Sequence, residues 1–327
     1  MTQIVVGVDG GGSKTRVIVA DEAGTELARV DGAASAVRPG GADRSGNVIA
    51  STVRDALSSA GLSDVRPSVV CVGVAGAGRE PERQALWRAL VEREIADDVV
   101  VHADATVALD DAFGDGPGIV LIAGTGSVAF GRGPTGTLAR CGGWGPVFGD
   151  EGGGAWMGRR ALSAATAAVD GREPETGLTG AIITAAQVDT VDDLIAWAAE
   201  AGPAGLASLA IAVLQCAESG DLRANAVVSF AAEELALHVR ALARTLFGDE
   251  RATSPVALAG GMLSRGSPLR SRLEHRLKSA VPGAHIHPHD VEPARGAVRA
   301  AVRALGYAPR AGSGRVGGSD RGSRDSF

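Results

Sequence analysis

The chain has 327 residues, enough for two domains of ordinary size, and 45% of them are hydrophobic. Its net charge of −6 argues against a nucleic-acid-binding protein, which usually carries a basic face. We expect no signal peptide at the first residues and no apolar stretch that reaches the length of a membrane span. We therefore expect a cytoplasmic protein that binds neither nucleic acid nor membrane.

Apolar runs and helical periodicity predict an ordered series of elements in the N-terminal part. The expected strands are 4–8, 14–20, 25–30, 69–74 and 99–102, and the expected helices are 42–60, 80–93 and 104–113. This β-β-β-α-β-α-β-α order is the layout of a ribonuclease-H-like domain.

The pattern then restarts with three strands, at 118–123, 128–132 and 137–141. Helices are expected at 155–170, 180–187, 191–201, 206–218, 222–247, 269–280 and 293–305, and strands at 256–258 and 285–287. A glycine-rich loop joins the first two strands of each half, so the halves look duplicated. We predict domains at 1–115 and 116–308, with the last helix able to pack back on the first domain. Residues 309–327 are almost free of apolar side chains, which predicts a disordered tail.

The sequence VVGVDGGGSKTR places a glycine loop between two strands. It is not a P-loop, because Ser13 separates the glycines from Lys14 and no helix follows. Consecutive glycines let backbone N–H groups curve around an anion, and Lys14 adds a positive charge. Asp9 is placed where a hydrated Mg²⁺ would need a carboxylate. A plain hairpin turn is the alternative interpretation.

Five loops follow strand ends, where ligands bind in α/β proteins. They are 9–15, 103–105, 124–127, 141–154 and 259–262. Two glycine loops of the phosphate-binding kind predict a nucleotide polyphosphate as ligand.

In order, the segments DGGGSKT, HADA, IAGTGS, GGWGPVFGDEGGGAW and LAGGM resemble the BadF/BadG-type ATPase family, which includes N-acetylglucosamine and glucosamine kinases. The resemblance covers about residues 4–306. It implies membership of the actin-like ATPase and sugar-kinase superfamily, with an α/β fold of two ribonuclease-H-like domains flanking a nucleotide-binding cleft. It also implies ATP and Mg²⁺ as cofactors, a sugar as substrate and a homodimer as the common assembly.

The resemblance assigns a role to individual residues. Asp104 would be the general base, and Asp9 would hold Mg²⁺ through water. The ATP-binding residues would be Gly11, Gly12, Ser13, Lys14, Thr15, Gly124, Thr125, Gly126, Gly260 and Gly261. The sugar-binding residues would be Ser127, Gly143, Trp144, Gly145, Asp150 and Glu151. The chemistry fits, since a carboxylate can orient a sugar hydroxyl and accept its proton. A helix N-cap is the alternative for Asp104, and a turn position for Asp150.

Two positions depart from the acetylglucosamine kinases, which have Asn where this chain has Val128 and another Asn in the stretch matching 34–38. The loss of two amides weakens the expectation of N-acetylglucosamine specificity, and glucosamine stays open. We expect phosphorylation of an amino sugar at its 6-hydroxyl. The alternatives are an ATPase activator of a 2-hydroxyacyl-CoA dehydratase, and a non-catalytic sugar sensor. The activators hold a [4Fe–4S] cluster with paired thiolates, whereas Cys71, Cys141 and Cys216 form no such pair.

Three further groups of residues are expected to have no role in the site. The alternating His285, His287 and His289 are interpreted as a surface strand end. The acidic pairs 97–98 and 110–111 are expected to be solvated.

Overall fold

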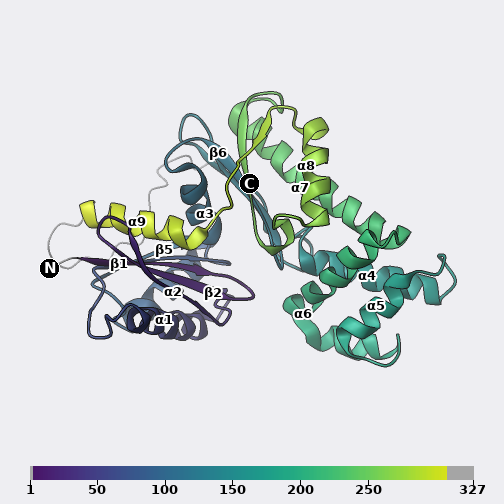
Figure 1. The fold of residues 1–327 in the computed structure, drawn as a ribbon, viewed down its shortest axis with the longest axis horizontal. Helices are drawn as coiled ribbons and strands as arrows, with labels where there is room; N and C mark the ends of the chain where they lie inside the picture. Colours follow the sequence, from purple (N-terminus) through teal and green to yellow (C-terminus); the bar gives the residue numbers. More distant parts are fainter. Residues whose placement is uncertain (1–2, 308–327) are drawn as a thin grey trace. The chain divides into compact units, whose positions relative to one another are not determined.

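The computed structural model describes residues 3–307, which form two mixed β-sheets and the helices packed on them (Figure 1). The described residues divide into two compact units, which we call unit 1 (3–111 and 292–307) and unit 2 (112–291). The domain boundary predicted from the sequence lies at 115–116, and the units divide at 111–112. The predicted tail, 309–327, lies outside the described residues.

Unit 1 contains five strands in the order β3-β2-β1-β4-β5. Its elements are β1 (Ile4–Gly10), β2 (Thr15–Asp21), β3 (Glu26–Gly32), α1 (Ala42–Ser59), β4 (Val69–Val74), α2 (Glu80–Val91), β5 (Asp98–Ala103), α3 (Asp104–Phe113) and α9 (Pro293–Tyr307). β2 is antiparallel to β1 and β3, whereas β4 and β5 continue the sheet in parallel with β1. The carboxyl ends of β1, β4 and β5 therefore lie at the same edge of the sheet.

Both faces of the central strands of unit 1 are buried, as parallel strands require. Val6 and Val8 of β1 belong to the cluster that includes Ile49 and Val53 of α1. Val5, which points to the opposite face, belongs to the cluster that includes Val298 of α9. α9 thus covers one face of the sheet and α1 the other, and the ends of the central strands are held between two helical layers (Figure 1).

Unit 2 repeats this sheet topology, with the strands in the order β10-β9-β6-β7-β8. Its elements are β6 (Gly118–Ala123), β7 (Ser127–Arg132), β8 (Leu138–Gly142), α4 (Gly154–Val169), α5 (Gly177–Ala186), α6 (Asp193–Glu218), α7 (Leu222–Phe247), β9 (Ser254–Ala259), the 3₁₀ helix η1 (Gly261–Leu263), α8 (Pro268–Ala280) and β10 (Ala284–Ile286). β6, β7 and β8 form an antiparallel meander, and β9 and β10 extend the sheet in parallel. The predicted duplication is confirmed.

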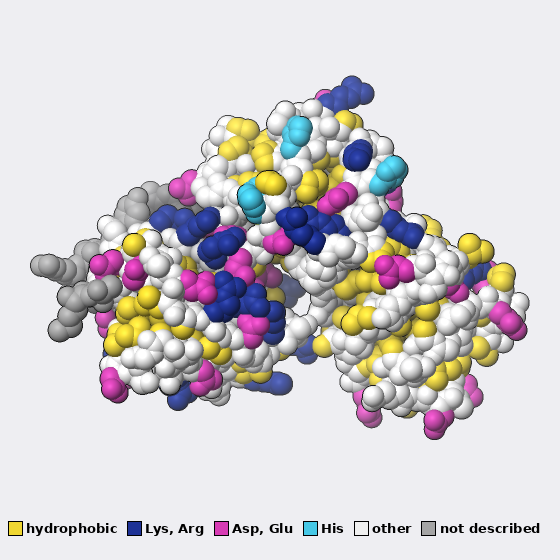
Figure 2. All heavy atoms as spheres, in the orientation of Figure 1, with side chains coloured by type: hydrophobic (Ala, Val, Ile, Leu, Met, Phe, Trp, Pro, Cys, Tyr) yellow, Lys and Arg dark blue, Asp and Glu magenta, His cyan; other side chains and the backbone are white. Residues whose placement is uncertain are grey.

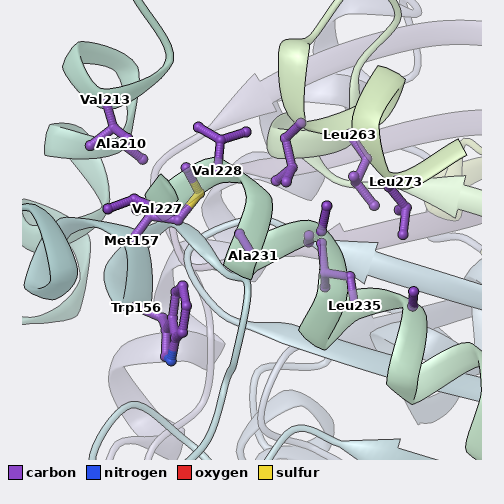
Figure 3. Packing of buried hydrophobic residues seen from close by; sticks show 14 of the residues in the cluster. Trp156, Met157, Ala210, Val213, Val227, Val228, Ala231, Leu235, Leu263 and Leu273 are labelled. Carbon is purple, nitrogen blue, oxygen red and sulfur yellow. The ribbon is translucent and has the colours of Figure 1, made fainter. Parts of the chain in front are cut away.

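The core of unit 2 is built mainly from aliphatic residues on and around α7. Val228, Ala231 and Leu235 of α7 belong to the same buried cluster as Met157 of α4 and Leu273 of α8 (Figure 3). The alanines let helices approach closely without aromatic side chains, as expected from the composition. This packing fixes α7 beneath β6, β7 and β8, where the loops of the candidate site begin.

One helix of unit 2 contradicts the expectation that no apolar stretch reaches the length of a membrane span. By length and composition alone, α6 is long and apolar enough to cross a membrane. Its backbone leaves the helical conformation at Gly202, just before Pro203, which breaks it into two segments close to those predicted. α6 packs against α4, α5 and α7 in unit 2.

The prediction that the acidic pair at the end of α3 is solvated is wrong. Asp110 and Asp111 are buried, with only 1% of the Asp111 side chain exposed. Asp111 accepts hydrogen bonds from Arg295 of α9. Asp110 is paired with Arg303, which lies further along the same helix. These pairs join α3 to α9. Apart from these buried pairs, acidic and basic side chains also lie next to one another on the drawn surface of the protein (Figure 2).

Candidate functional site

The first glycine loop, residues 11–14, joins β1 to β2 as predicted. The N–H of Gly11 donates to the Lys14 carbonyl at 2.9 Å, which closes a tight turn. The N–H groups of Ser35 and Ala36 donate to the Gly11 carbonyl, which anchors the loop from below. Among residues 3–307, the exposed amides of Gly12 and Ser13 donate to no acceptor. Two adjacent free N–H groups of this kind suit an anion such as phosphate.

Asp9 and Asp104 are brought together where β1 and β5 end. Burial, with the negative charges of Asp104 and Glu292, raises the pKa of Asp9 to about 7, against the opposing effect of Arg16 and Lys14. Burial also raises the pKa of Asp104, whose carboxylate accepts a hydrogen bond from the Ala105 N–H at 2.9 Å. Two buried carboxylates whose pKa values are raised create a demand for positive charge.

Mg²⁺ fits this pair of residues. It binds through one or two carboxylates, keeps several waters and shares phosphate oxygens, so it does not need a cage of protein ligands. Within the described residues, no group of three or more His, Cys, Asp or Glu side chains could hold a metal. The demand for positive charge at Asp9 and Asp104 is therefore the observation that supports Mg²⁺.

The two residues that end the first loop lie in different environments. The Lys14 side chain is 55% exposed, and its Nζ lies 3.3 Å from the Asp31 carboxylate. Thr15 is fully buried, and its hydroxyl donates to the Ala33 carbonyl at 2.5 Å and lies 2.6 Å from Ser35 Oγ. Lys14 is thus available to a ligand at the surface, whereas the Thr15 side chain fixes the loop from inside.

In unit 2 the second glycine loop, residues 124–126, joins β6 to β7 and supports the start of α4. The Gly124 and Thr125 carbonyls accept from the N–H groups of Gly154 and Ala155 at 2.8 and 2.9 Å. These bonds satisfy two N–H groups that a helix N-terminus leaves without partners. The N–H groups of Thr125 and Gly126 donate to no acceptor among the described residues, so this loop has the same capacity for an anion as the first.

The loop predicted to border the nucleoside lies beside this second glycine loop. Gly260 follows β9, which pairs in parallel with β6, and its φ of +88° is one that glycine adopts readily. A Cβ at Gly260 would lie 2.3 Å from the Ala123 carbonyl oxygen, so its backbone rests directly on the end of β6. Residues 124–126 and 260–261 therefore form one continuous edge of unit 2.

The segment from Gly142, the last residue of β8, to Gly153, which precedes α4, is called the 142–153 loop. The residues predicted to bind sugar tie this loop to the second glycine loop. A Cβ at Gly126 would lie 2.4 Å from Asp150 Oδ2, so a larger residue there would displace that carboxylate. Asp150 has a φ of +59° and accepts from the Gly145 N–H at 3.1 Å, and burial raises its pKa. Ser127 donates its hydroxyl hydrogen to the Glu151 carbonyl at 2.6 Å, so it anchors the loop.

Trp144 is outside the core, since 56% of it is exposed. The Arg140 guanidinium lies 4.7 Å from the centre of its ring and also donates to the Gly143 carbonyl. Val147 and Phe148 of the same loop are exposed as well. The loop therefore carries an exposed aromatic ring and two acidic residues, which suit the apolar face and the hydroxyls of a sugar.

The structure adds two residues that sequence reasoning missed. Glu292, which begins the return of the chain to unit 1, raises the pKa of Asp9 and is itself paired with Arg16 at 3.2 Å. His238 lies in the middle of α7 and reaches the Glu151 carboxylate. Neither residue belongs to a motif, and their contacts come from segments far away in the sequence. His287 packs edge-on against Phe113 and His289, and no metal group is formed there among the described residues.

Residues 6–303 match the model of the BadF/BadG/BcrA/BcrD ATPase family. The chain is 31% identical over 262 residues to an N-acetylmuramic acid/N-acetylglucosamine kinase of Clostridium acetobutylicum, covering 80% of this chain and 85% of that protein. It is 29% identical to an N-acetyl-D-glucosamine kinase of Dictyostelium discoideum, covering 92% of this chain and 98% of that protein.

Solved structures share the fold. A Chromobacterium violaceum protein described as a candidate N-acetylglucosamine kinase has a TM-score of 0.77 and 32% identity, covering 91% of this chain and 98% of that one. A ROK family glucokinase from Streptomyces griseus has a TM-score of 0.61 and 18% identity, covering 92% of this chain and 99% of that one. The latter supports the predicted actin-like architecture alone. With a family model matched over nearly its whole described length, the chain belongs to the BadF/BadG/BcrA/BcrD ATPase family.

Proposed function

We propose that the protein is an ATP-dependent kinase that phosphorylates the 6-hydroxyl of an amino sugar. Relatives with about 30% identity over most of the chain are named as kinases of N-acetylglucosamine and N-acetylmuramic acid. The observation that carries the proposal is the pair Asp9 and Asp104, two carboxylates of raised pKa beside a loop with free N–H groups. ATP supplies the phosphoryl group.

Asp104 is the general base in this proposal. Its carboxylate accepts the proton of the sugar hydroxyl as the hydroxyl oxygen forms a bond to the γ-phosphorus and the bond from the γ-phosphorus to the β-phosphate oxygen breaks. Burial raises the pKa of Asp104, which makes it a stronger proton acceptor than an exposed aspartate. Phosphoryl transfer otherwise depends on alignment and on neutralising charge.

The glycine loops supply that neutralisation. The N–H groups of Gly12, Ser13, Thr125 and Gly126 would donate to phosphate oxygens of ATP, and Lys14 would add a positive charge. Asp9 would hold Mg²⁺ through water, and bound Mg²⁺ supplies positive charge to the phosphates. Binding of the cation also favours the ionised form of both carboxylates, so the base is ready when the nucleotide is present.

The 142–153 loop would bind the sugar. Asp150 and Glu151 can accept hydrogen bonds from hydroxyl or ammonium groups, and Trp144 can cover an apolar sugar face. Where acetylglucosamine kinases have an amide, Val128 offers only methyl groups, and one of them would lie 2.9 Å from a Cβ at Gly143. A pair of acidic residues without a nearby amide favours a cationic amino group over an acetamide, so glucosamine is the first sugar to test.

A coupled assay for ADP release tests the proposed function. The panel is glucosamine, N-acetylglucosamine, N-acetylmuramic acid, N-acetylmannosamine and glucose, each with MgATP. The proposal expects sugar-dependent ADP release with at least one amino sugar and a 6-phosphate in the product. ADP release at background with every sugar would contradict the proposal and would support the non-catalytic sugar sensor. Iron and sulfide in the purified protein would support the ATPase activator of a dehydratase.

A further inference from the structure

His238 is a buried titratable residue that no part of the proposed mechanism uses. It lies in α7, and 8% of its side chain is exposed. Its Nδ1 lies 2.7 Å from the Glu234 carbonyl oxygen in the preceding turn of the helix. A carbonyl oxygen can only accept, so Nδ1 carries the hydrogen and the other nitrogen, Nε2, is directed away from the helix.

The Nε2 atom of His238 points from α7 toward the 142–153 loop. It lies 3.8 Å from Glu151 Oε2. It is also in contact with Gly142, where a Cβ would lie 2.4 Å from Nε2. Gly142 has a φ of +76°, so both its conformation and the space above the imidazole require glycine. The ring therefore contacts the loop at its first residue and at the carboxylate near its other end.

The positions of the hydrogens on His238 decide whether its contact with Glu151 is attractive or repulsive. An ionised carboxylate can only accept, so the contact is attractive when Nε2 carries a hydrogen and repulsive when it presents a lone pair. Because Nδ1 already carries a hydrogen, Nε2 carries one only in the imidazolium form of His238, in which both ring nitrogens donate. Asp150 on the same loop interacts electrostatically with Glu151, His238 and Arg159 of α4, and Arg140 of β8 and Glu151 both act on Cys141. The main chain of Glu151 is already held by Ser127, so a contact from His238 fixes the remaining freedom of its side chain.

We propose that His238, in its imidazolium form, is a positioning residue of the sugar site, which donates from Nε2 to the Glu151 carboxylate and so fixes the carboxylate and the 142–153 loop for a sugar hydroxyl or ammonium group. The inference rests on the proposed function for the identity of the ligand. It assigns to α7, a helix of the core, a direct influence on how the sugar is bound. Apo contacts of this kind often shorten when the ligand is present.

Two substitutions at one position separate positioning from packing. His238→Gln keeps an N–H donor near the place of Nε2, whereas His238→Leu keeps the volume and removes the donor. We expect His238→Leu to raise the sugar KM roughly tenfold or more, with the ATP KM within about twofold, and His238→Gln to restore most of the sugar affinity. Leu242→Ala is the control, because Leu242 is a buried residue of α7 and should lower stability without changing the sugar KM.

A double-mutant cycle and hydrogen exchange complete the test. If the two side chains act together, Glu151→Gln with His238→Leu raises the sugar KM no more than the more damaging single variant does. Amide exchange in the 142–153 loop should be faster in His238→Leu than in His238→Gln, and this measurement does not need turnover. If exchange is faster in His238→Leu but the protein phosphorylates no sugar, the proposed function is wrong and the positioning of the 142–153 loop by His238 is retained. Equal exchange and equal sugar KM in an active enzyme would overturn the inference.

Discussion

Asp111 at the end of α3 is the residue whose removal should weaken unit 1 most specifically. Its carboxylate accepts from Arg295 Nε and Nη2 at 2.6 and 2.7 Å and from the Glu292 N–H at 2.8 Å. Asp111 is the last residue before the chain leaves unit 1, and Glu292 is the first after it returns. The buried Asp111 side chain therefore links the point where the chain leaves unit 1 to the point where it returns, and it positions α9 against the sheet.

The cost of Asp111→Ala follows from these three bonds. A hydrogen bond to a charged group contributes about 1.5–3 kcal/mol. The Arg295 side chain is 48% exposed and can return to water, so its two bonds count for less than this. The Glu292 N–H, in contrast, loses its acceptor within the folded unit. We expect a loss of about 2–4 kcal/mol in the free energy of unfolding, and a smaller loss for Asp111→Asn, which keeps an acceptor.

Urea unfolding followed by circular dichroism measures this difference, with the midpoint and slope fitted together. Asp97→Ala is the matched control, because Asp97 pairs with Arg66 at 3.1 Å but both side chains are more than half exposed. Such an exposed pair should contribute less than about 1 kcal/mol. The reasoning is refuted if Asp111→Ala is no more destabilising than Asp97→Ala.

Three other results are expected. Gly126→Ala should reduce kcat/KM for the sugar about tenfold or more, because the added Cβ would displace the Asp150 carboxylate. Gly180→Ala is the control and should leave kcat/KM unchanged, because a Cβ at Gly180 would meet open space. Because burial raises the pKa of Asp150, its protonation should raise the sugar KM at a pH above the ordinary aspartate value of about 4, and Asp150→Asn should remove this rise. Burial raises the pKa of Cys71 to about 12, so mass spectrometry should find it unmodified by iodoacetamide in the native protein at pH 8 and modified after unfolding.

The order of strands and helices could be predicted from the sequence because each element carries its own periodicity. The glycine loops were found for the same reason, since a run of glycines between two apolar segments is a local signal. The break of α6 at Gly202 was visible in the sequence as well, as a gap between two helical segments. That both glycine loops bind one nucleotide stays a prediction.

Side-chain environments that depend on distant partners could not be predicted. Asp110 and Asp111 look like solvated surface acids until α9, almost two hundred residues later, brings Arg303 and Arg295 to them. Thr15 was expected to contact ATP, but its hydroxyl hydrogen bonds inside the protein to residues 33 and 35. A lone histidine in an amphipathic helix gives no signal that its ring meets Glu151.

The most direct test of the account is the turnover of Asp104→Asn with the preferred sugar, measured as formation of the sugar phosphate by ³¹P NMR and compared with ATP binding to the same variant. Asn keeps the shape of the side chain and loses the ability to accept a proton. If Asp104 is the general base, kcat falls by about 10²–10⁴ while ATP binds as tightly as to the unmodified protein. A variant that still phosphorylates the sugar at a rate close to that of the unmodified protein would contradict the assignment.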